Sequence, residues 1–105
     1  SYEADELLFL FGLNKKLGPI LDWNIDLSGK KIKVNTENYQ TSKEGIFAVG
    51  DINDYPGKLD LILSGFHETT LAVQEAYKRI YPGERVPFGY TTSNSKLQEK
   101  LGVKK

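Results

Sequence analysis

Two short apolar runs stand out along the chain. Residues 7–11 are five consecutive apolar residues closed by Gly12, a pattern typical of a buried strand. Residues 46–49 form a second compact run, entered by Gly45 and closed by Gly50. Because a continuous apolar run of this length indicates a strand covered on both faces, we expect residues 46–49 to be a central strand of a sheet.

Between these runs, apolar and polar residues alternate. Residues 30–35 place Ile32 and Val34 on one face, which predicts a half-exposed strand. A turn is expected just before this strand, at residues 28–29, where serine and glycine favour a chain reversal. Residues 36–40 are a candidate partner for the strand.

The long helical pattern lies at residues 59–81. Asp60 is a candidate N-cap, two basic residues end the pattern, and the proline and glycine at 82–83 stop it. A second, short helix is predicted at residues 95–101, with its N-cap at Asn94 or the next residue. The recurring positions of the long helix are mostly small, so this face should pack closely on a flat surface: Ile62, Gly65, Thr69, Ala72, Ala76 and Ile80.

Composition and charge exclude several classes of function. The 105 residues carry 14 acidic and 14 basic side chains, so bulk charge does not favour nucleic acid or an anionic membrane as a partner. No apolar run approaches the roughly 18 residues of a membrane span, and acidic residues stand where a signal peptide is basic. The chain has no cysteine for a thiolate metal site or a redox pair. We therefore expect a cytoplasmic protein.

The charge is nevertheless unevenly distributed. Residues 1–76 hold 12 acidic and 7 basic side chains, whereas residues 77–105 hold 2 acidic and 7 basic ones. The basic segment is typical of a solvated helix end and tail. The alternative interpretation is a docking surface for an acidic protein partner.

The candidate chemistry lies at residues 41–52. A predicted strand ends in Gly50 and Asp51, and a loop then leads to the long helix. Gly50 lets the backbone approach a ligand closely, and Asp51 stands at the carboxyl end of a strand, where open α/β sheets bind ligands. A carboxylate there can accept hydrogen bonds from sugar or ribityl hydroxyls. The residues alone leave open the alternative that Asp51 only caps a turn.

These residues resemble the second flavin fingerprint of flavoproteins with two dinucleotide-binding domains. That fingerprint is a threonine, six spacer residues and Ala-x-Gly-Asp, and it is matched here by Thr41, Ala48, Gly50 and Asp51. Further motifs in the same order make nearly the whole chain similar to ferredoxin–NADP⁺ reductase of the thioredoxin-reductase-like type. They are Phe11-Gly12, Leu17-Gly18-Pro19-Ile20, Trp23, Tyr55-Pro56-Gly57-Lys58-Leu59, Ile62, Ser64-Gly65-Phe66 and Tyr90-Thr91-Thr92-Ser93.

The resemblance implies an α/β fold, the carboxyl-terminal half of a Rossmann-like FAD-binding domain with short strands, one long helix and a tail. Residues 1–22 would be the connector from an NAD(P)H domain outside this chain. Residues 23–82 would be the second half of the FAD domain, and residues 83–105 a tail that covers the flavin. GxGxxG, which belongs to the first half, does not occur here. The chain is thus expected to be the carboxyl-terminal piece of a longer enzyme, inactive by itself.

The resemblance also implies which residues contact the cofactor. Asp51 would hydrogen-bond the ribityl chain of FAD beside Gly50, and the backbone amide of Ile52 would face the pyrophosphate. Leu61 and Ile62 begin the long helix. The positive end of that helix would point at the pyrimidine edge of the isoalloxazine and make flavin reduction easier.

The tail would complete the flavin site. Tyr90 would stack on the re face of the flavin, and Thr91 and Thr92 would place their hydroxyls near it, Thr92 being the better-supported contact. In several members of the family this tail covers the flavin of the partner subunit, so a homodimer is implied. No catalytic side chain is implied within these residues, and NADPH would bind outside the chain. The residues bind, orient and tune a cofactor that performs the redox chemistry.

The implied activity is electron transfer between NADPH and ferredoxin or flavodoxin through FAD. One alternative is a segment of a thioredoxin-reductase-like disulfide reductase. The chain departs from that enzyme because it lacks an Arg-Gln pair after Gly-Asp and continues well beyond the long helix. The other alternative is a non-catalytic domain that self-associates through its helix face.

No metal or nucleophile site is predicted. His67 is the single histidine and has no partner at motif spacing, so a structural role is expected. Residues 51–62 resemble a calcium loop. However, Pro56 stands where such a loop needs glycine, and Ile62 stands where it needs glutamate.

Overall fold

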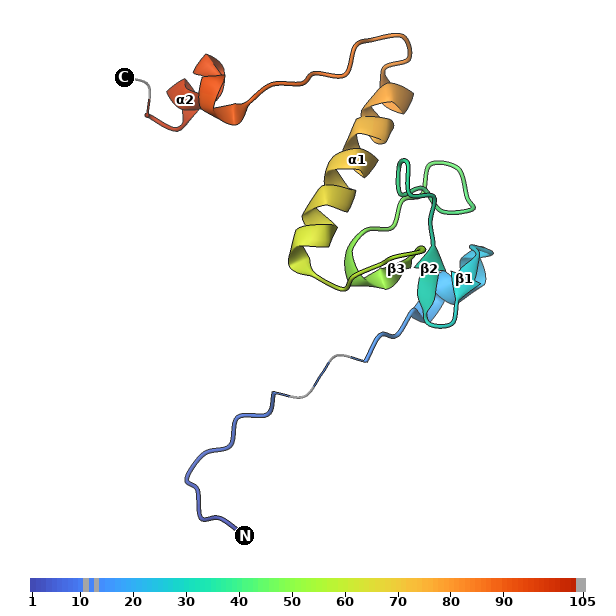
Figure 1. Cartoon of the computed structure of the whole chain (residues 1–105), viewed down its shortest axis with the longest axis vertical. Coiled ribbons are helices and arrows are strands. Elements are labelled where there is room, and N and C mark those ends of the chain that lie inside the picture. The colour runs from blue at the N-terminus through green and yellow to red at the C-terminus, as the bar shows by residue number, and fades with distance from the viewer. Residues whose placement is uncertain (11, 13, 104–105) are drawn as a thin grey trace.

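A three-stranded sheet and one long helix form the folded part of the chain (Figure 1). The computed structural model describes residues 1–10, 12 and 14–103. Strand β1 (Leu27–Ser28) pairs antiparallel with β2 (Lys31–Lys33), and β2 pairs parallel with β3 (Asn53–Asp54). The sheet therefore places the residues that closely follow the fingerprint beside β2.

The hairpin of β1 and β2 confirms the strand predicted from alternation, although it is shorter than residues 30–35. Ile32 is 5% exposed and lies opposite Leu27, whereas Lys33 is exposed. Gly29 has φ +59°, which the tight turn requires and which glycine adopts without a steric penalty.

The candidate partner at residues 36–40 is wrong. These residues form a turn in which the Asn35 amide donates to the Gln40 carbonyl at 2.9 Å and the Tyr39 amide donates to the Asn35 carbonyl at 2.7 Å. Neither bond adds a strand to β2. Both edges of β2 are already paired, by β1 and by β3, so no edge remains for a third partner.

The predicted central strand at residues 46–49 is wrong, because this segment belongs to none of the three strands of the sheet. Its single bridge joins Gln40 and Phe47, and it is held against the chain before it by Thr41 N to Ile46 O at 2.8 Å and Ala48 N to Tyr39 O at 3.0 Å. The apolar run nonetheless contributes to the hydrophobic core, because its residue Ala48 is only 6% exposed.

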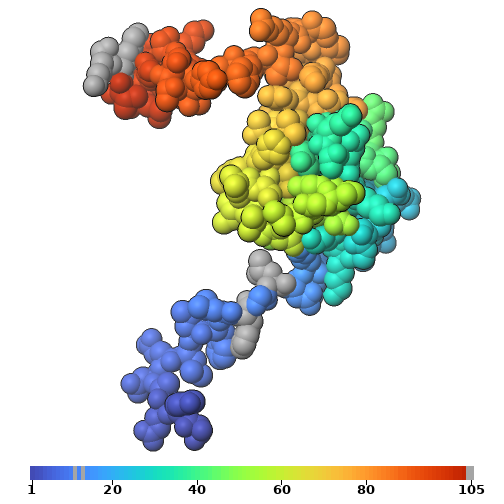
Figure 2. Space-filling view, viewed as in Figure 1, coloured from blue at the N-terminus to red at the C-terminus, as the bar shows by residue number. Residues whose placement is uncertain are grey.

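The predicted buried strand at residues 7–11 is wrong for the residues that the structure describes. Residues 7–10 lie in no strand, and their side chains are between 68% and 84% exposed. Residue 11 lies outside the described residues. Figure 2 shows the N-terminal segment projecting from the folded part. An apolar run becomes a buried strand only where a neighbouring strand and a covering layer exist, and Figure 1 shows no strand of the described chain beside these residues.

The hydrophobic core is built from residues of the sheet, of the 3₁₀ turn η1 (Gly18–Trp23) and of the apolar run at residues 46–49. Its buried members lie between residues 17 and 48, so this core joins the chain before the sheet to the fingerprint segment. They are Leu17, Ile25, Ile32 and Ala48, with Ile20, Leu27, Val34, Ile46 and Ile52 packed around them.

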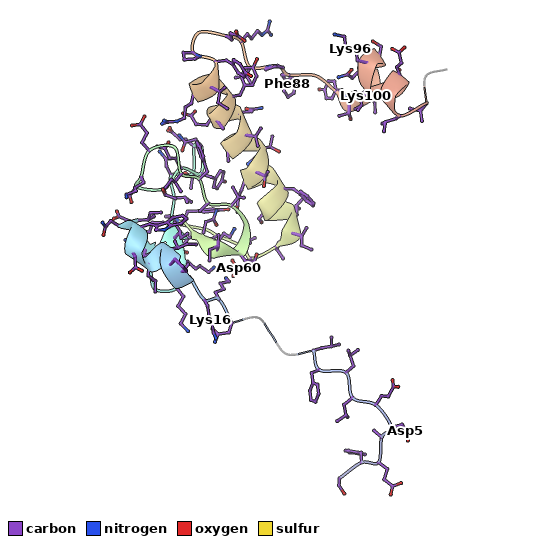
Figure 3. The ribbon with its side chains drawn as sticks, turned by 180° about the vertical axis from the view of Figure 1, so that it is seen from behind. Asp5, Lys16, Asp60, Phe88, Lys96 and Lys100 are labelled. Atoms are coloured by element: carbon purple, nitrogen blue, oxygen red, sulfur yellow. The ribbon has the colours of Figure 1, made fainter. Side chains whose placement is uncertain are left out.

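Helix α1 (Ile62–Ile80) confirms the long helical pattern, but the prediction that Asp60 caps it is wrong. The N-cap residue is Leu61, and no side chain caps it. The Asp60 carboxylate instead binds two lysines, Lys15 at 3.1 Å and Lys31 at 2.8 Å. Figure 3 shows Asp60 at the edge of the folded part that faces the N-terminal segment. The two cations hold the carboxylate away from the helix amides.

The small-residue face of α1 packs only in part, because Ile62, Thr69 and Ile80 are exposed. Ala72 is 7% exposed, and a β-carbon built on Gly65 would lie 3.5 Å from the Cα atom of Gly50. Gly50 belongs to the 3₁₀ turn η2 (Gly50–Ile52), which packs against α1. The last turn carries the predicted basic residues, Lys78 and Arg79.

The C-terminal segment leaves the far end of α1 and extends away from the sheet (Figures 1 and 2). It contains the 3₁₀ turn η3 (Thr91–Ser93) and the short helix α2 (Ser95–Lys100). The side chain of Asn94 accepts the Leu97 amide at 3.1 Å, which confirms the predicted cap.

Candidate functional site

The turn η2 presents open backbone beside the start of α1. Gly50 has φ +77°, and a β-carbon built on it would meet nothing within 4 Å. Asp51 is exposed, and Ile52 is half-buried against the core. The turn is therefore anchored at Ile52 and packed against α1 at Gly65, while Gly50 and Asp51 remain accessible to a ligand.

Each fingerprint residue has a local structural reason. The Thr41 hydroxyl accepts the Lys43 amide at 3.2 Å and donates to the Lys43 carbonyl at 3.1 Å, which closes the turn before the apolar run. Ala48 fills the core, and its carbonyl accepts Asn53 Nδ2 at 3.0 Å. Gly50 provides the positive φ. The spacing thus builds the turn that exposes Asp51.

A buried carboxylate lies beneath the turn. Glu68, on α1, is fully buried, and its Oε2 accepts the backbone amide of Gly50 at 2.6 Å and Nδ2 of Asn53 at 2.8 Å. Its Oε1 accepts the hydroxyl of Tyr55 at 3.0 Å and the ammonium of Lys58. We call these five residues the Glu68 cluster: Gly50, Asn53, Tyr55, Lys58 and Glu68.

The Lys58 ammonium completes this arrangement. Its side chain is 4% exposed, and Nζ also donates to the carbonyl oxygen of Gly50 at 2.9 Å. Nζ lies 5.4 Å from the ring centroid of Tyr55, within range of a cation–π contact. The ion pair of Lys58 and Glu68 therefore contacts both polar groups of the Gly50 backbone.

The electrostatics of the Glu68 cluster favour the charged carboxylate. Burial alone would raise the pKa of Glu68, but the hydrogen bonds from Lys58, the Gly50 amide and Tyr55 outweigh burial and hold this pKa below its ordinary value. Burial and the hydrogen bond to Glu68 raise the pKa of the Tyr55 hydroxyl well above its ordinary value. Tyr55 thus remains a neutral donor to an ionised Glu68.

Comparison with curated proteins gives a consistent result. A ferredoxin–NADP reductase from Mesorhizobium japonicum is 60% identical over 97 residues, which are 92% of this chain and 28% of the relative. One from Beijerinckia indica is 57% identical over 100 residues, 95% of this chain and 29% of the relative. One from Pelagibacter ubique is 54% identical over 103 residues, 98% of this chain and 30% of the relative.

The chain is homologous to a segment of ferredoxin–NADP reductases. This confirms the resemblance inferred from the fingerprint and the motifs around it. No family model matches the chain. The chain spans less than one third of the length of these relatives.

The structure brings together some of the predicted site residues. Gly50, Asp51 and Ile52 share η2, which packs against α1 near its start. Leu61 and Ile62 stand at that start and are 53% and 82% exposed. Two elements that pack together thus carry exposed apolar side chains on one and an exposed carboxylate on the other.

The predicted tail contacts lie elsewhere. Tyr90 is 74% exposed, and its ring lies against Phe88 with centroids 6.0 Å apart. Thr91 and Thr92 are exposed in η3 and line a hollow of about 340 Å³ with residues of the α2 segment. Figure 3 shows Phe88 beyond the far end of α1, away from the edge marked by Asp60.

The Glu68 cluster was missed by the sequence reasoning, although one signal was present. Glu68 follows Gly65 by three residues and precedes Ala72 by four, so it stands on the small-residue face of α1. A carboxylate on a packing face predicts a buried partner, because an unpaired buried charge is costly. Lys58 and Tyr55 were recognised only as parts of a motif.

Two further kinds of site were searched for in the part of the chain that the structure describes. No group of three or more acidic or histidine side chains there is placed to hold a metal ion. None of the helices described is both long and apolar enough to cross a membrane.

Proposed function

We propose that this chain is the flavin-binding carboxyl-terminal part of an FAD-dependent ferredoxin–NADP reductase. The enzyme would move electrons between NADPH and ferredoxin or flavodoxin. The observation that carries the proposal is the 54–60% identity to enzymes of that name over at least 92% of this chain. The NADPH site and the GxGxxG half of the FAD domain would lie outside the chain, which by itself would be inactive.

The turn η2 fits an FAD molecule. The accessible carboxylate of Asp51 suits the ribityl hydroxyls, and the open face of Gly50 suits a close approach of the cofactor to the backbone. The amide of Ile52 would face the pyrophosphate. When bound, the flavin supplies the electron-transfer chemistry, and these residues position it.

The start of α1 would meet the pyrimidine edge of the flavin ring. No side chain caps Leu61, so the amides of the first turn and the positive helix end are free of a competing carboxylate. Leu61 and Ile62 are exposed and apolar, as expected of residues that a planar ring system covers.

Within this proposal, the tail residues contact the flavin of a second subunit. Tyr90, Thr91 and Thr92 are exposed and lie on an extended segment, which supports the proposal that residues 83–105 cover the flavin of a partner subunit in a homodimer. Within the same proposal, residues 1–22 form the connector from the NAD(P)H domain and residues 23–82 the second half of the FAD domain.

A segment replacement tests the proposal. In the Mesorhizobium japonicum reductase, the matching 97-residue stretch is replaced by this chain, and we call the product the carrier reductase. We expect the purified carrier reductase to retain FAD and to reduce ferredoxin with NADPH. A well-folded carrier reductase that lacks flavin, beside a natural enzyme that holds it, would contradict the proposal.

A single substitution then tests the site. Asp51→Ala in the carrier reductase should lower the flavin content of the purified protein and weaken FAD rebinding. Asp22→Ala is the matched control, because Asp22 is also exposed but lies in η1. Equal flavin content in the two variants would show that Asp51 does not contact the flavin. Activity of the 105-residue chain alone would contradict the expectation that it is inactive by itself.

A further inference from the structure

The backbone of Gly50 is held at both of its polar groups by one buried ion pair. Its amide donates to Oε2 of Glu68 at 2.6 Å, and its carbonyl accepts Nζ of Lys58 at 2.9 Å. Lys58 and Glu68 are themselves paired, with side chains 4% and 0% exposed. None of the family motifs used above assigns a role to Glu68.

We propose that Glu68 and Lys58 are positioning residues for the flavin, which set the orientation of the turn η2 and thereby the direction of Asp51. This inference rests on the proposed function, since it concerns how the same site is held in shape. Neither side chain touches the ligand, because both are buried beneath the turn.

The need for such a device follows from the backbone of the turn. Gly50 has φ +77° and no side chain, so its torsions are the softest point between the core residue Ala48 and the candidate ligand residue Asp51. A rotation at Gly50 would redirect Asp51 without disturbing the core. Two hydrogen bonds to the same residue, one at each end, prevent that rotation.

The two bonds are of the strong kind. In each of them one partner is ionised, and such hydrogen bonds are shorter and stronger than those between neutral groups. Both lie in a buried site, where competition from water is small. Tyr55 and Asn53 occupy the remaining acceptor positions of the Glu68 carboxylate, so this carboxylate is itself held in one orientation.

The two positioning residues also come from different elements. Glu68 lies on α1, whereas Lys58 lies in the loop between β3 and α1. The turn is therefore fixed relative to the start of α1, where Leu61 and Ile62 stand. A displaced turn would separate Asp51 from that helix start, and the two parts could no longer contact one ligand together.

The test measures FAD affinity in the carrier reductase after reversible removal of the flavin. Lys58→Met and Glu68→Gln should each raise the FAD dissociation constant about tenfold or more, the usual consequence of losing a charge-assisted hydrogen bond. Tyr77→Phe is the matched control. It also removes a tyrosine hydroxyl that donates to a carboxylate, that of Glu84 at 3.3 Å, but this pair lies outside the Glu68 cluster, so FAD affinity should stay within about twofold of the parent.

A double variant separates positioning from folding. Lys58→Met combined with Glu68→Gln leaves no unpaired buried charge, and the carboxamide oxygen that replaces the carboxylate can still accept the Gly50 amide. We expect this variant to unfold at a temperature close to that of the parent and yet to bind FAD more weakly, because the bond to the Gly50 carbonyl is missing. Parent-like FAD affinity in this well-folded variant would overturn the proposal.

Coupling to Asp51 provides the decisive measurement. If Lys58 acts through the direction of Asp51, Lys58→Met should weaken FAD binding much less in an Asp51→Ala background, while its effect on thermal unfolding stays the same in both backgrounds. Additive effects on FAD affinity would overturn the positioning role. A carrier reductase that binds no FAD at all would instead refute the proposed function, so the two failures are distinguishable.

Discussion

A β-carbon built on Gly65 would lie 3.5 Å from the Cα atom of Gly50, so the first turn of α1 contacts the turn η2 backbone to backbone. This contact brings the fingerprint glycine to the beginning of the helix. The gap is that of an ordinary van der Waals contact, and it leaves room for one carbon atom but not for a branched side chain.

Alanine and valine at position 65 should therefore have opposite effects on stability. Gly65→Ala should stabilise the carrier reductase by up to about 1 kcal/mol, because alanine is the better helix former. Gly65→Val adds two further carbons against the Gly50 backbone and should destabilise it by about 1–3 kcal/mol. Thermal unfolding of both variants checks the order. A valine variant as stable as the alanine variant would show that the contact is loose.

Substitution of Gly50 should be costly even though nothing crowds it. Gly50→Ala places a β-carbon on a residue with φ +77°, a conformation that costs about 1–2 kcal/mol for an L-residue. Gly89→Ala is the control, since Gly89 has no positive φ and a β-carbon there meets nothing within 4 Å. Unfolding midpoints of the two variants should differ by several degrees, and equal midpoints would contradict the assigned backbone strain.

Stability should fall below pH 4.5 because of Glu68. Its pKa is lower in the folded protein than its ordinary value of 4.5. The stabilisation it provides is therefore fully present above pH 4.5 and is lost as the pH falls through the lower folded-state pKa. Thermal unfolding of the carrier reductase followed from pH 7 downward should show this loss, and Glu68→Gln should flatten the decline.

Asp60 serves as the comparison for the acid decline. Its hydrogen bonds to Lys31 and Lys15 also lower its pKa, but Asp60 is solvent-exposed and the two lysines are only half-buried. Asp60→Asn should change the acid decline less than Glu68→Gln does, and its effect should shrink as salt is added, since salt screens exposed ion pairs. If the two substitutions changed the acid decline equally, burial would not be what makes the Glu68 carboxylate important for stability.

The isolated 105-residue chain should self-associate. The start of α1 exposes Leu61, Ile62, Leu63 and Phe66 by between 53% and 82%, an apolar surface that needs a cover. Size-exclusion chromatography with light scattering should report a mass above 11.8 kDa. Phe66→Glu should reduce association, whereas Lys78→Gln, which changes the net charge equally at the far end of α1, should not. A monomeric parent chain would contradict the expectation.

Local sequence was sufficient for features that neighbouring residues fix. The helix at residues 62–80, the cap of α2 at Asn94 and the turn at Gly29 follow from periodicity, side-chain hydrogen bonding and glycine conformation. The fingerprint also located η2, because each of its residues builds a nearby turn or fills the core beside it.

Local sequence was insufficient where a residue has several distant partners to choose from. Asp60 stands where an N-cap belongs, yet it binds Lys15 and Lys31, which are 45 and 29 residues away. The apolar run at residues 7–10 matches a buried strand, but no strand of the described chain lies beside it.

The sequence by itself determined the long helix, the accessible turn with Asp51 at its tip and the homology to ferredoxin–NADP reductases. The tertiary structure alone decided that Glu68 and Lys58 form hydrogen bonds with the backbone of Gly50. The physical reason is that a buried ion pair forms only when packing removes both groups from water and brings their segments together. No local sequence pattern specifies the pairing of Glu68 with Lys58. A helix or a glycine turn, in contrast, is specified by residues that are adjacent or close in sequence.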